Sequence, residues 1–294
     1  MGELGVKLLV WALGLVALGY IVRWWMIERG RRGEDPVDRR PRISDFLVGF
    51  VTNFFDTLGI GSFAPATAWF KFSKRMPDEL IPGTLNSGQA LPTMAQALIL
   101  MSLVPVDFTT LISMVIASLV GAWLGVGFVA RLSRRAIQLG MGFSLLCAAA
   151  LFFARNMDWM PGGGEALGLN GGVLVFAVIM NAFLGALMML GVGLYAPCLI
   201  LVSLLGMSPR AAFPIMSGSC GLLMPVGGAR FIKARRYHMG ASLGLTIGGI
   251  PGVILAAKLV WSLPIVQLRW LVLFVVLYAA VQMLLSARRE AASR

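Results

Sequence analysis

Side chains that carry reactive chemistry are scarce in this chain. Of its 294 residues, one is histidine, three are cysteine and 13 are aspartate or glutamate. His238 lies in a basic loop, and Cys147, Cys198 and Cys220 lack the spacing of metal ligands or of a disulfide framework. No histidine-based triad and no glycine-rich phosphate loop is recognisable. We therefore expect a protein that is not an enzyme and needs no metal or cofactor.

Long charged stretches are also missing, and apolar runs take their place. Hydrophobic residues make up 58% of the chain and charged residues 13%, with a mean hydropathy of +0.84. Most of the apolar runs exceed the roughly 20 residues that a spanning helix needs, and none alternates like a barrel strand. The sequence predicts an all-α polytopic membrane protein, embedded in the lipid bilayer.

The net charge of +12 has a topological origin. Basic residues occupy short loops between apolar runs rather than one face, so we predict membrane anchors and no nucleic acid partner. The basic clusters expected in the cytoplasm are 28–42, 131–135, 233–236 and 288–289. Residues 155–170, rich in glycine, are expected outside. This arrangement is typical of a multi-pass protein of the bacterial inner membrane with a cytoplasmic C-terminus.

A helix-breaking motif occurs twice. Residues 59–65 read Gly-Ile-Gly-Ser-Phe-Ala-Pro, and residues 191–197 read Gly-Val-Gly-Leu-Tyr-Ala-Pro. Other pairs keep the same spacing of 132 residues, or a spacing of 127 further along: Pro82 with Pro214, Ser87 with Ser219, Gly121 with Gly248 and Gly125 with Gly252. The ordered series indicates an internal duplication, as in carriers built from repeats with interrupted helices.

These signals divide the chain into segments. The first run lacks a basic start and a cleavage site, so we interpret it as a transmembrane helix rather than a signal peptide. The expected segments are a transmembrane helix at 1–27, a basic cytoplasmic linker at 28–42, a first repeat at 43–154, an extracytoplasmic loop at 155–170, a second repeat at 171–286 and a cytoplasmic tail at 287–294.

The basic clusters also predict a topology. Three spans and one re-entrant segment in each half place the clusters on one side and make the halves inverted repeats. The re-entrant segments are expected at 82–103 and 214–230, which are small, polar and bracketed by prolines. Lys71, Lys74 and Arg75 do not fit, because this topology places them outside.

The helix breaks are the expected substrate site. Half-helix N-termini favour an anion. Asp56 is the only acid well inside an apolar run, whereas a carrier of cations would be expected to have more acids there. The alternative is close helix packing by small residues, which we prefer for Gly121 and Gly125. The predicted substrate-binding residues are Gly59, Gly61, Ser62, Pro65, Asn86, Ser87, Gly88, Gln89, Gly191, Gly193, Tyr195, Pro197, Ser217, Gly218, Ser219 and Cys220.

Three further residues carry paired hypotheses. Asp56, on the same helix face as Asn53, could couple a proton to transport, or it could be a structural partner for a basic group or a helix end. Arg230 could guide an anion from the cytoplasm or act as a positive-inside anchor. Cys220 could contact a soft sulfur substrate or simply pack.

The chain resembles the sulfite exporter TauE/SafE family over residues 44–286, through the motifs at 59–65, 82–87 and 121–125 and their second-half echoes. The resemblance implies a duplicated helical carrier that moves sulfite, sulfonates such as sulfoacetate, or related sulfur anions out of the cytoplasm. Some members act in uptake. The N-terminal helix with its arginine-rich linker looks like an addition to the family pattern.

Together, residues and resemblance predict a secondary transporter that exports sulfite or a small organosulfonate. The expected mechanism is alternating access around a midplane site between the two repeats, with a proton coupled through Asp56 if one is coupled. A sulfur-anion importer, an anion channel and a membrane assembly protein remain as alternatives. The sequence gives no oligomeric state.

Overall fold

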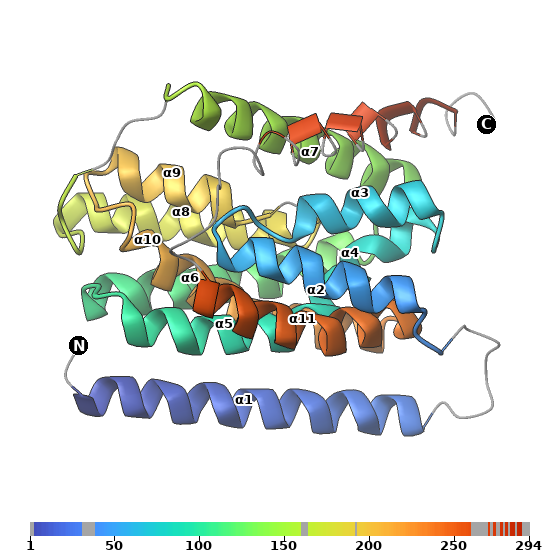
Figure 1. Ribbon diagram of the computed structural model, residues 1–294, viewed down its shortest axis with the longest axis horizontal. Helices are drawn as coiled ribbons and strands as arrows, with labels where there is room; N and C mark the ends of the chain where they lie inside the picture. The colour runs from blue at the N-terminus through green and yellow to red at the C-terminus, as the bar shows by residue number, and fades with distance from the viewer. Residues whose placement is uncertain are drawn as a thin grey trace.

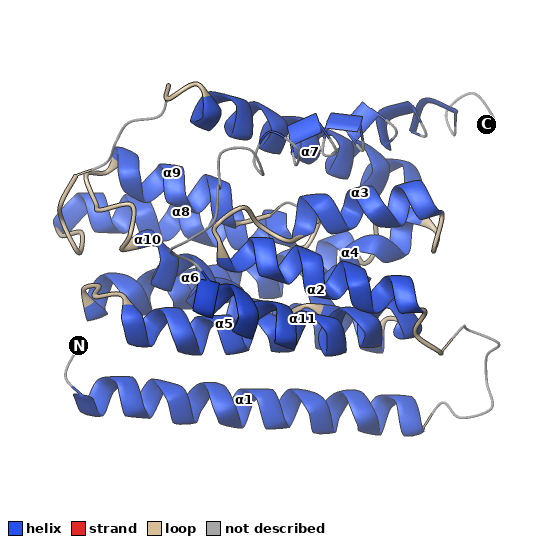
Figure 2. Ribbon diagram, viewed as in Figure 1, coloured by secondary structure: helices blue, strands red, loops and turns tan. Residues whose placement is uncertain are grey.

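Every element of the computed structural model is a helix, and no strand occurs in the part of the chain that is described (Figure 2). The structure describes residues 3–30, 39–159, 164–191 and 193–259, together with 270, 273–274, 277–278, 280–281, 283–285 and 287–289. This confirms the predicted all-α class.

The helices run roughly side by side along one axis, with α1 at one edge of the stack and α7 near the other (Figure 1). In chain order they are α1 (Glu3–Arg29), α2 (Ile43–Thr57), α3 (Phe63–Ser73), the short η1 (Asp78–Leu80), α4 (Ile81–Gly88), α5 (Ala90–Leu103), α6 (Phe108–Val129), α7 (Arg134–Asn156), α8 (Gly171–Met188), α9 (Tyr195–Leu204), α10 (Ala212–Lys233) and α11 (Met239–Leu259).

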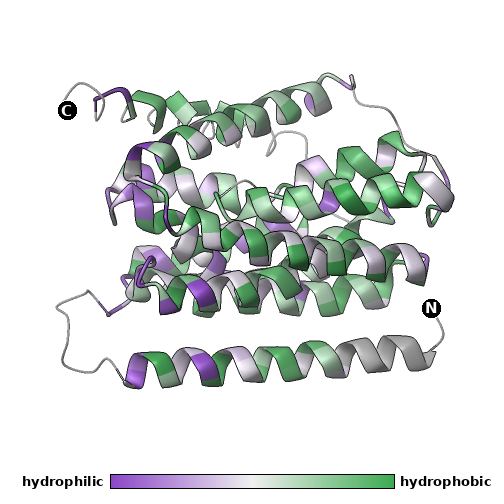
Figure 3. Ribbon diagram, turned by 180° about the vertical axis from the view of Figure 1, so that it is seen from behind, coloured by the Kyte–Doolittle hydropathy of each residue, from purple (hydrophilic) through white to green (hydrophobic). Residues whose placement is uncertain are grey.

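Hydrogen bonds between loops define two ends of the molecule. At the end that we call the basic end, Arg236 donates to the Ala130 and Leu132 carbonyls, and the His238 backbone N–H donates to Thr84. At the opposite end, the Asp107 backbone N–H donates to the Leu167 carbonyl, 2.8 Å away. The helix sides are largely apolar and the polar residues gather toward the ends, as Figure 3 shows. This is the distribution expected of a bilayer-spanning protein.

Two pairs of helices turn back inside the molecule. The first hairpin, α2–α3, leaves the basic end and returns to it, because Arg75 beyond α3 pairs with Asp45 in the first turn of α2 at 2.9 Å. The second hairpin, α8–α9, leaves and rejoins the opposite end, where the Ser208 N–H donates to the Ala166 carbonyl at 2.8 Å. The two hairpins thus enter from opposite ends (Figure 1).

The hairpins that turn back inside the molecule lie at other positions than the re-entrant segments that the sequence predicted. The segment 82–103 forms α4 and α5, which together run from the basic end to the opposite end. The segment 214–230 lies within α10, one continuous helix of 22 residues that is apolar enough to span a bilayer. Two half-length helices and one full span have similar summed hydropathy, so composition alone could not separate them. Because the α2–α3 hairpin returns to the basic end, Lys71, Lys74 and Arg75 lie at that end.

The two halves of the chain are interlocked. α2 of the first half packs on α11 of the second, and α8 of the second packs on α6 of the first. Glycines permit both contacts: a Cβ at Gly121 or Gly125 would meet the backbone of Ala182 or Ala186, and one at Gly248 or Gly252 would meet Phe46 or Phe50. The matched glycines of the duplication therefore make equivalent contacts, as packing by small residues requires.

Candidate functional site between the hairpin tips

Glycines end the first helix of each hairpin. Gly59 follows α2 with φ +80°, and Gly191 follows α8 with φ +91°. This left-handed conformation is the usual helix stop and favours glycine, which explains the repeated motif. The tips then meet reciprocally: a Cβ at Gly61 would lie 3.9 Å from Tyr195, and one at Gly193 would lie 3.7 Å from Phe63. The N-termini of α3 and α9 consequently begin at one central place.

Asp56 lies at this place, in the last turn of α2, and is 2% exposed. Ser62, Tyr195 and Gln96 lie beside its carboxylate. Oxygen Oδ2 has no hydrogen-bond partner among the described residues. A carboxylate at membrane depth with an unused oxygen is a candidate functional group.

Two glutamines connect the hairpin tips to α5. The Ser62 hydroxyl donates to Gln89 Oε1 at 2.5 Å, and Gln96 Nε2 donates to the Tyr195 hydroxyl at 2.7 Å. Gln89 occupies the junction between α4 and α5. Each tip is therefore joined to the same crossing helix by one amide.

The cluster has unused hydrogen-bonding capacity. Gln89, Thr93 and Gln96 follow the i, i+4, i+7 spacing that aligns side chains on one helix face. All three are fully buried. Gln89 Nε2, Thr93 Oγ1 and Gln96 Oε1 have no partner within the described residues. Sequence reasoning missed Thr93 and Gln96; the signals that could have found them are their polarity inside an apolar run and their spacing from Gln89.

Cysteine and methionine sulfur atoms border the cluster. Cys198 and Cys220 are both fully buried, and Cys220 lies near Asp56 and Tyr195. The Cys220 thiol also donates to Met188 Sδ at 3.6 Å. The structure thus places Cys220 beside the end of α8, and its contact with substrate stays a prediction.

Several predicted site residues are instead engaged in helix packing in the first half. Ser87 pairs with Ser242 at 2.7 Å, and its carbonyl accepts from Tyr20 of α1. Gly88 lies against the Ser242 backbone. Asn86 donates to the Pro82 carbonyl at 2.9 Å and, at 3.4 Å, to the carbonyl of Met188 at the end of α8. Of these three, Asn86 alone touches a hairpin end.

The same holds in the second half. Ser217 donates to the Phe213 carbonyl of its own helix at 2.7 Å, and Gly218 packs against Met101. Ser219 accepts from Asn181, which fastens α10 to α8 at 3.1 Å. Small polar residues satisfied in this way allow helices to approach closely, so composition alone cannot separate them from a binding site.

The remaining predicted residues lie around the hairpins. Asn53 donates to the Gly49 carbonyl within α2, at 2.8 Å. Pro65 is half-buried, and Pro197 lines an apolar groove of about 280 Å³. Arg230 lies over the Trp123 ring on an outer groove rather than between the tips. The structure does not bring Arg230 into the central cluster.

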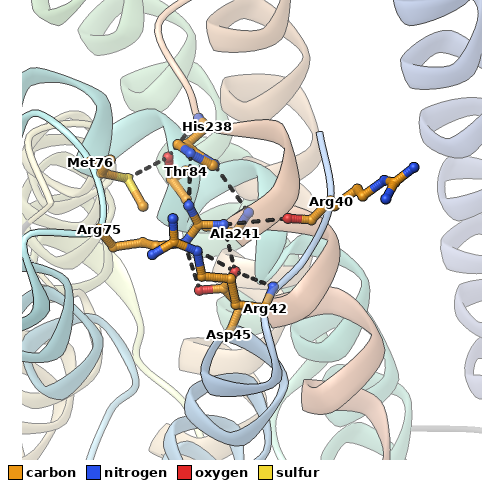
Figure 4. A network of polar contacts seen from close by, with 8 residues as sticks. All are labelled: Arg40, Arg42, Asp45, Arg75, Met76, Thr84, His238 and Ala241. Atoms are coloured by element: carbon orange, nitrogen blue, oxygen red, sulfur yellow. Dashed lines mark hydrogen bonds and ion pairs between the residues drawn. The ribbon is translucent and has the colours of Figure 1, made fainter. Parts of the chain in front are cut away.

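A buried charged network closes the base of the first hairpin (Figure 4). Arg75 binds Asp45 through Nη2 at 2.9 Å, and its Nη1 lies 3.2 Å from Nε2 of His238. Asp45 Oδ2 also accepts from the backbone N–H of Arg42. The single histidine of the chain thus lies in a network that joins the hairpin base to α11.

The central arrangement suits a small oxyanion. Two helix N-termini carry partial positive charge toward it, and neutral amide and hydroxyl groups offer donors. Within the described residues, no group of three or more His, Cys, Asp or Glu side chains could hold a metal ion.

Comparison with known proteins gives one match. A family model described as "Sulfite exporter TauE/SafE" matches residues 2–152, just over half of the 294 residues. The match includes α1, which the sequence analysis interpreted as an addition to the family, and does not reach the second half. No curated protein and no solved structure matches the chain.

Proposed function

The chain belongs to the sulfite exporter TauE/SafE family, which makes it a multi-pass membrane transporter for sulfite or a related sulfur anion, and from this premise we propose how it works. Its substrate is sulfite or a small organosulfonate, bound between the tips of the two hairpins and exported from the cytoplasm. The observation that carries the proposal is the reciprocal meeting of the tips around buried polar atoms that have no partner among the residues the structure describes.

The proposed binding contacts are neutral. Gln89 Nε2 and the Thr93 hydroxyl supply donors, and the N-termini of α3 and α9 supply partial positive charge. Sulfite and sulfonates present several oxygens to such donors. A site without a fixed cation holds an anion loosely enough to release it, as transport requires.

The basic end is cytoplasmic in this proposal, following the positive-inside rule, and the membrane is the bacterial inner membrane. Each hairpin then enters from one side, so parting the first hairpin from its neighbours opens the site inward and parting the second opens it outward. This is alternating access between inverted repeats. The membrane potential assists export of a negative charge by about 2.3 kcal/mol per 100 mV.

Asp56 is the proposed proton carrier. An ionised carboxylate beside a bound anion is repulsive, so occupancy of the site by the anion and protonation of Asp56 favour each other. Release of both on one side returns Asp56 to its ionised form. The proton cancels one negative charge of the load, so in this coupled cycle the membrane potential assists the export of a dianion such as sulfite, which leaves with a net charge of −1.

The test measures sulfite and sulfoacetate flux into proteoliposomes, with and without an imposed pH gradient. Gln89→Leu should raise the half-saturating sulfite concentration about tenfold, since a donor to a charged group is lost. Asp56→Asn should abolish the pH dependence. Ser217→Ala is the matched control, because that buried hydroxyl is satisfied within its own helix, and it should behave like the wild type.

The alternatives give different results. Flux that never saturates would indicate a channel, and faster flux toward the basic end would indicate an importer. Absence of flux in a folded protein would leave a membrane assembly role. Reactivity of Cys198 and Cys220 with a maleimide in a Cys147→Ser variant adds a readout: both thiols are buried, so labelling that rises during turnover supports alternating access.

A further inference from the structure

A cavity of about 570 Å³ lies between α1, α6 and α10, outside the proposed transport site. α1 contributes Val16 and Arg23, α6 contributes Trp123, and α10 contributes Val226, Arg230 and Lys233. We call it the α1 groove. Trp123 is 56% exposed, so the groove opens onto the apolar outer surface of the bundle rather than toward the hairpin tips.

The charge of the α1 groove is of one sign. Three cations line it, Arg23, Arg230 and Lys233, and its lining includes no acidic residue. Arg230 and Lys233 follow each other by three positions, which places them on one face of α10. Arg230 lies 5.3 Å from the Trp123 ring centroid and donates to the Trp123 carbonyl, so its guanidinium is fixed in place.

The groove is polarised along the membrane normal. Arg23 and Lys233 lie near the basic ends of α1 and α10. Val16 lies seven positions before Arg23, and Val226 lies seven positions before Lys233. Seven helical residues span about 10 Å. The groove is therefore cationic near the membrane surface and apolar about 10 Å deeper, which matches the headgroup and the upper acyl chains of a phospholipid.

We propose that the α1 groove binds a phospholipid with an anionic headgroup. Its phosphate lies among Arg23, Arg230 and Lys233, and an acyl chain lies along Val16 and Val226. Basic pockets between spanning helices are suited to such headgroups. Tyr20 borders the same groove and donates to the Ser87 carbonyl in α4, so an occupied groove also stabilises the docking of α1 on the repeats. This site assigns Arg230 to lipid, in place of the guidance of substrate.

The test titrates the purified full-length protein with phosphatidylglycerol or phosphatidylcholine of identical chains and counts bound lipids by native mass spectrometry. Arg23→Gln/Arg230→Gln should weaken phosphatidylglycerol binding about 30-fold, since each cation near the surface contributes about 1 kcal/mol. The control, Lys74→Gln/Arg131→Gln, removes two exposed cations of the same end outside the groove and should retain wild-type binding.

Three outcomes would overturn the proposal. Equal losses of binding in both double variants would mean that diffuse surface charge attracts the lipid. Equal binding of the two lipids would mean that the groove does not recognise an anionic headgroup. Release of the lipid by millimolar sulfite would mean that sulfite binds in the groove and that the groove is part of the substrate path. Sulfite flux by the Arg23→Gln/Arg230→Gln variant checks that it is folded, and it is independent of the lipid result.

Discussion

The two hairpins have the same shape and different chemistry. The first is closed at its base by a buried ion pair, Arg75 with Asp45, and carries Asp56 near its tip. The second is closed by backbone hydrogen bonds between Ala166, Ser208 and their neighbours, and no acid occurs in α8 or α9. A fold can therefore be duplicated while charge is kept in one copy. The first hairpin is the one whose contacts can respond to protons.

The largest expected effect comes from breaking the base of the first hairpin. Arg75→Met leaves the fully buried Asp45 without its cation and should destabilise the protein by about 3–5 kcal/mol. The measurement is thermal unfolding in detergent. Asp45→Asn/Arg75→Met should regain part of the loss, because the uncompensated charge is removed. A loss below about 1 kcal/mol in the single variant would show that the ion pair does not hold the hairpin.

The glycine contacts of the two halves should contribute equally to stability, whereas the bases of the two hairpins should not. Gly121→Ala and Gly248→Ala each force a Cβ into a backbone carbonyl of the facing helix, Ala182 or Phe46. Overpacking of this kind costs about 1–3 kcal/mol, and the two losses should agree. Gly14→Ala, with open space around it, is the control and should be neutral. A large difference between the two main variants would argue against equivalent packing.

The amide link at the tips allows a finer comparison. Tyr195→Phe removes the acceptor of Gln96 and should cost about 1–2 kcal/mol in unfolding free energy. A double-mutant cycle with Gln96→Leu should return a coupling energy of about 1 kcal/mol. Additive losses would mean that the two tips are not joined through this bond.

The smallest effect is expected beside the second hairpin. Asp107 caps α6, and the backbone N–H of Thr110 is the main cause that lowers the pKa of this exposed carboxyl below its ordinary value. A lowered pKa means that the contribution to stability is present at neutral pH and is lost as the pH falls through the folded-state pKa. Asp107→Ala should cost about 1 kcal/mol or less at pH 7 and nothing at pH 2. Denaturant midpoints at the two pH values check this.

Sequence alone predicted the class of the protein and the positions of its breaks. The glycine stops of α2 and α8 and the matched glycines follow from local rules, because positive φ and close helix approach both demand glycine. The location of the turn-backs could not be predicted, since the hydropathy of α2 and α3 together resembles that of a single span. The misfit of Lys71, Lys74 and Arg75 was the available signal for it.

The residues of the central polar cluster were predicted in part. Ser62 and Tyr195 were found because they lie in the repeated motif, and Gln89 because it lies in the polar segment bracketed by prolines. In the structure Ser62 donates to Gln89, and Tyr195 accepts from Gln96. Ser87 and Ser217 were named on composition, and both hydroxyls proved to be satisfied in packing. Gln96 and Thr93 were missed because they lie in an apolar run, although with Gln89 they follow the i, i+4, i+7 spacing of one helix face. The partner of Gln96, Tyr195, lies on another helix.

The interlocking of the halves bears on how the protein is made. α2 ends at Thr57, and α11, on which it packs most extensively, begins at Met239. At about 5–20 residues per second, α2 waits on the order of ten to forty seconds for that partner to leave the ribosome. Until then the face of α2 that later contacts Gly248 and Gly252 of α11 is exposed to lipid or to a chaperone. We therefore expect that the first half does not fold when it is expressed by itself, and that a split protein assembles only when both halves enter the same membrane.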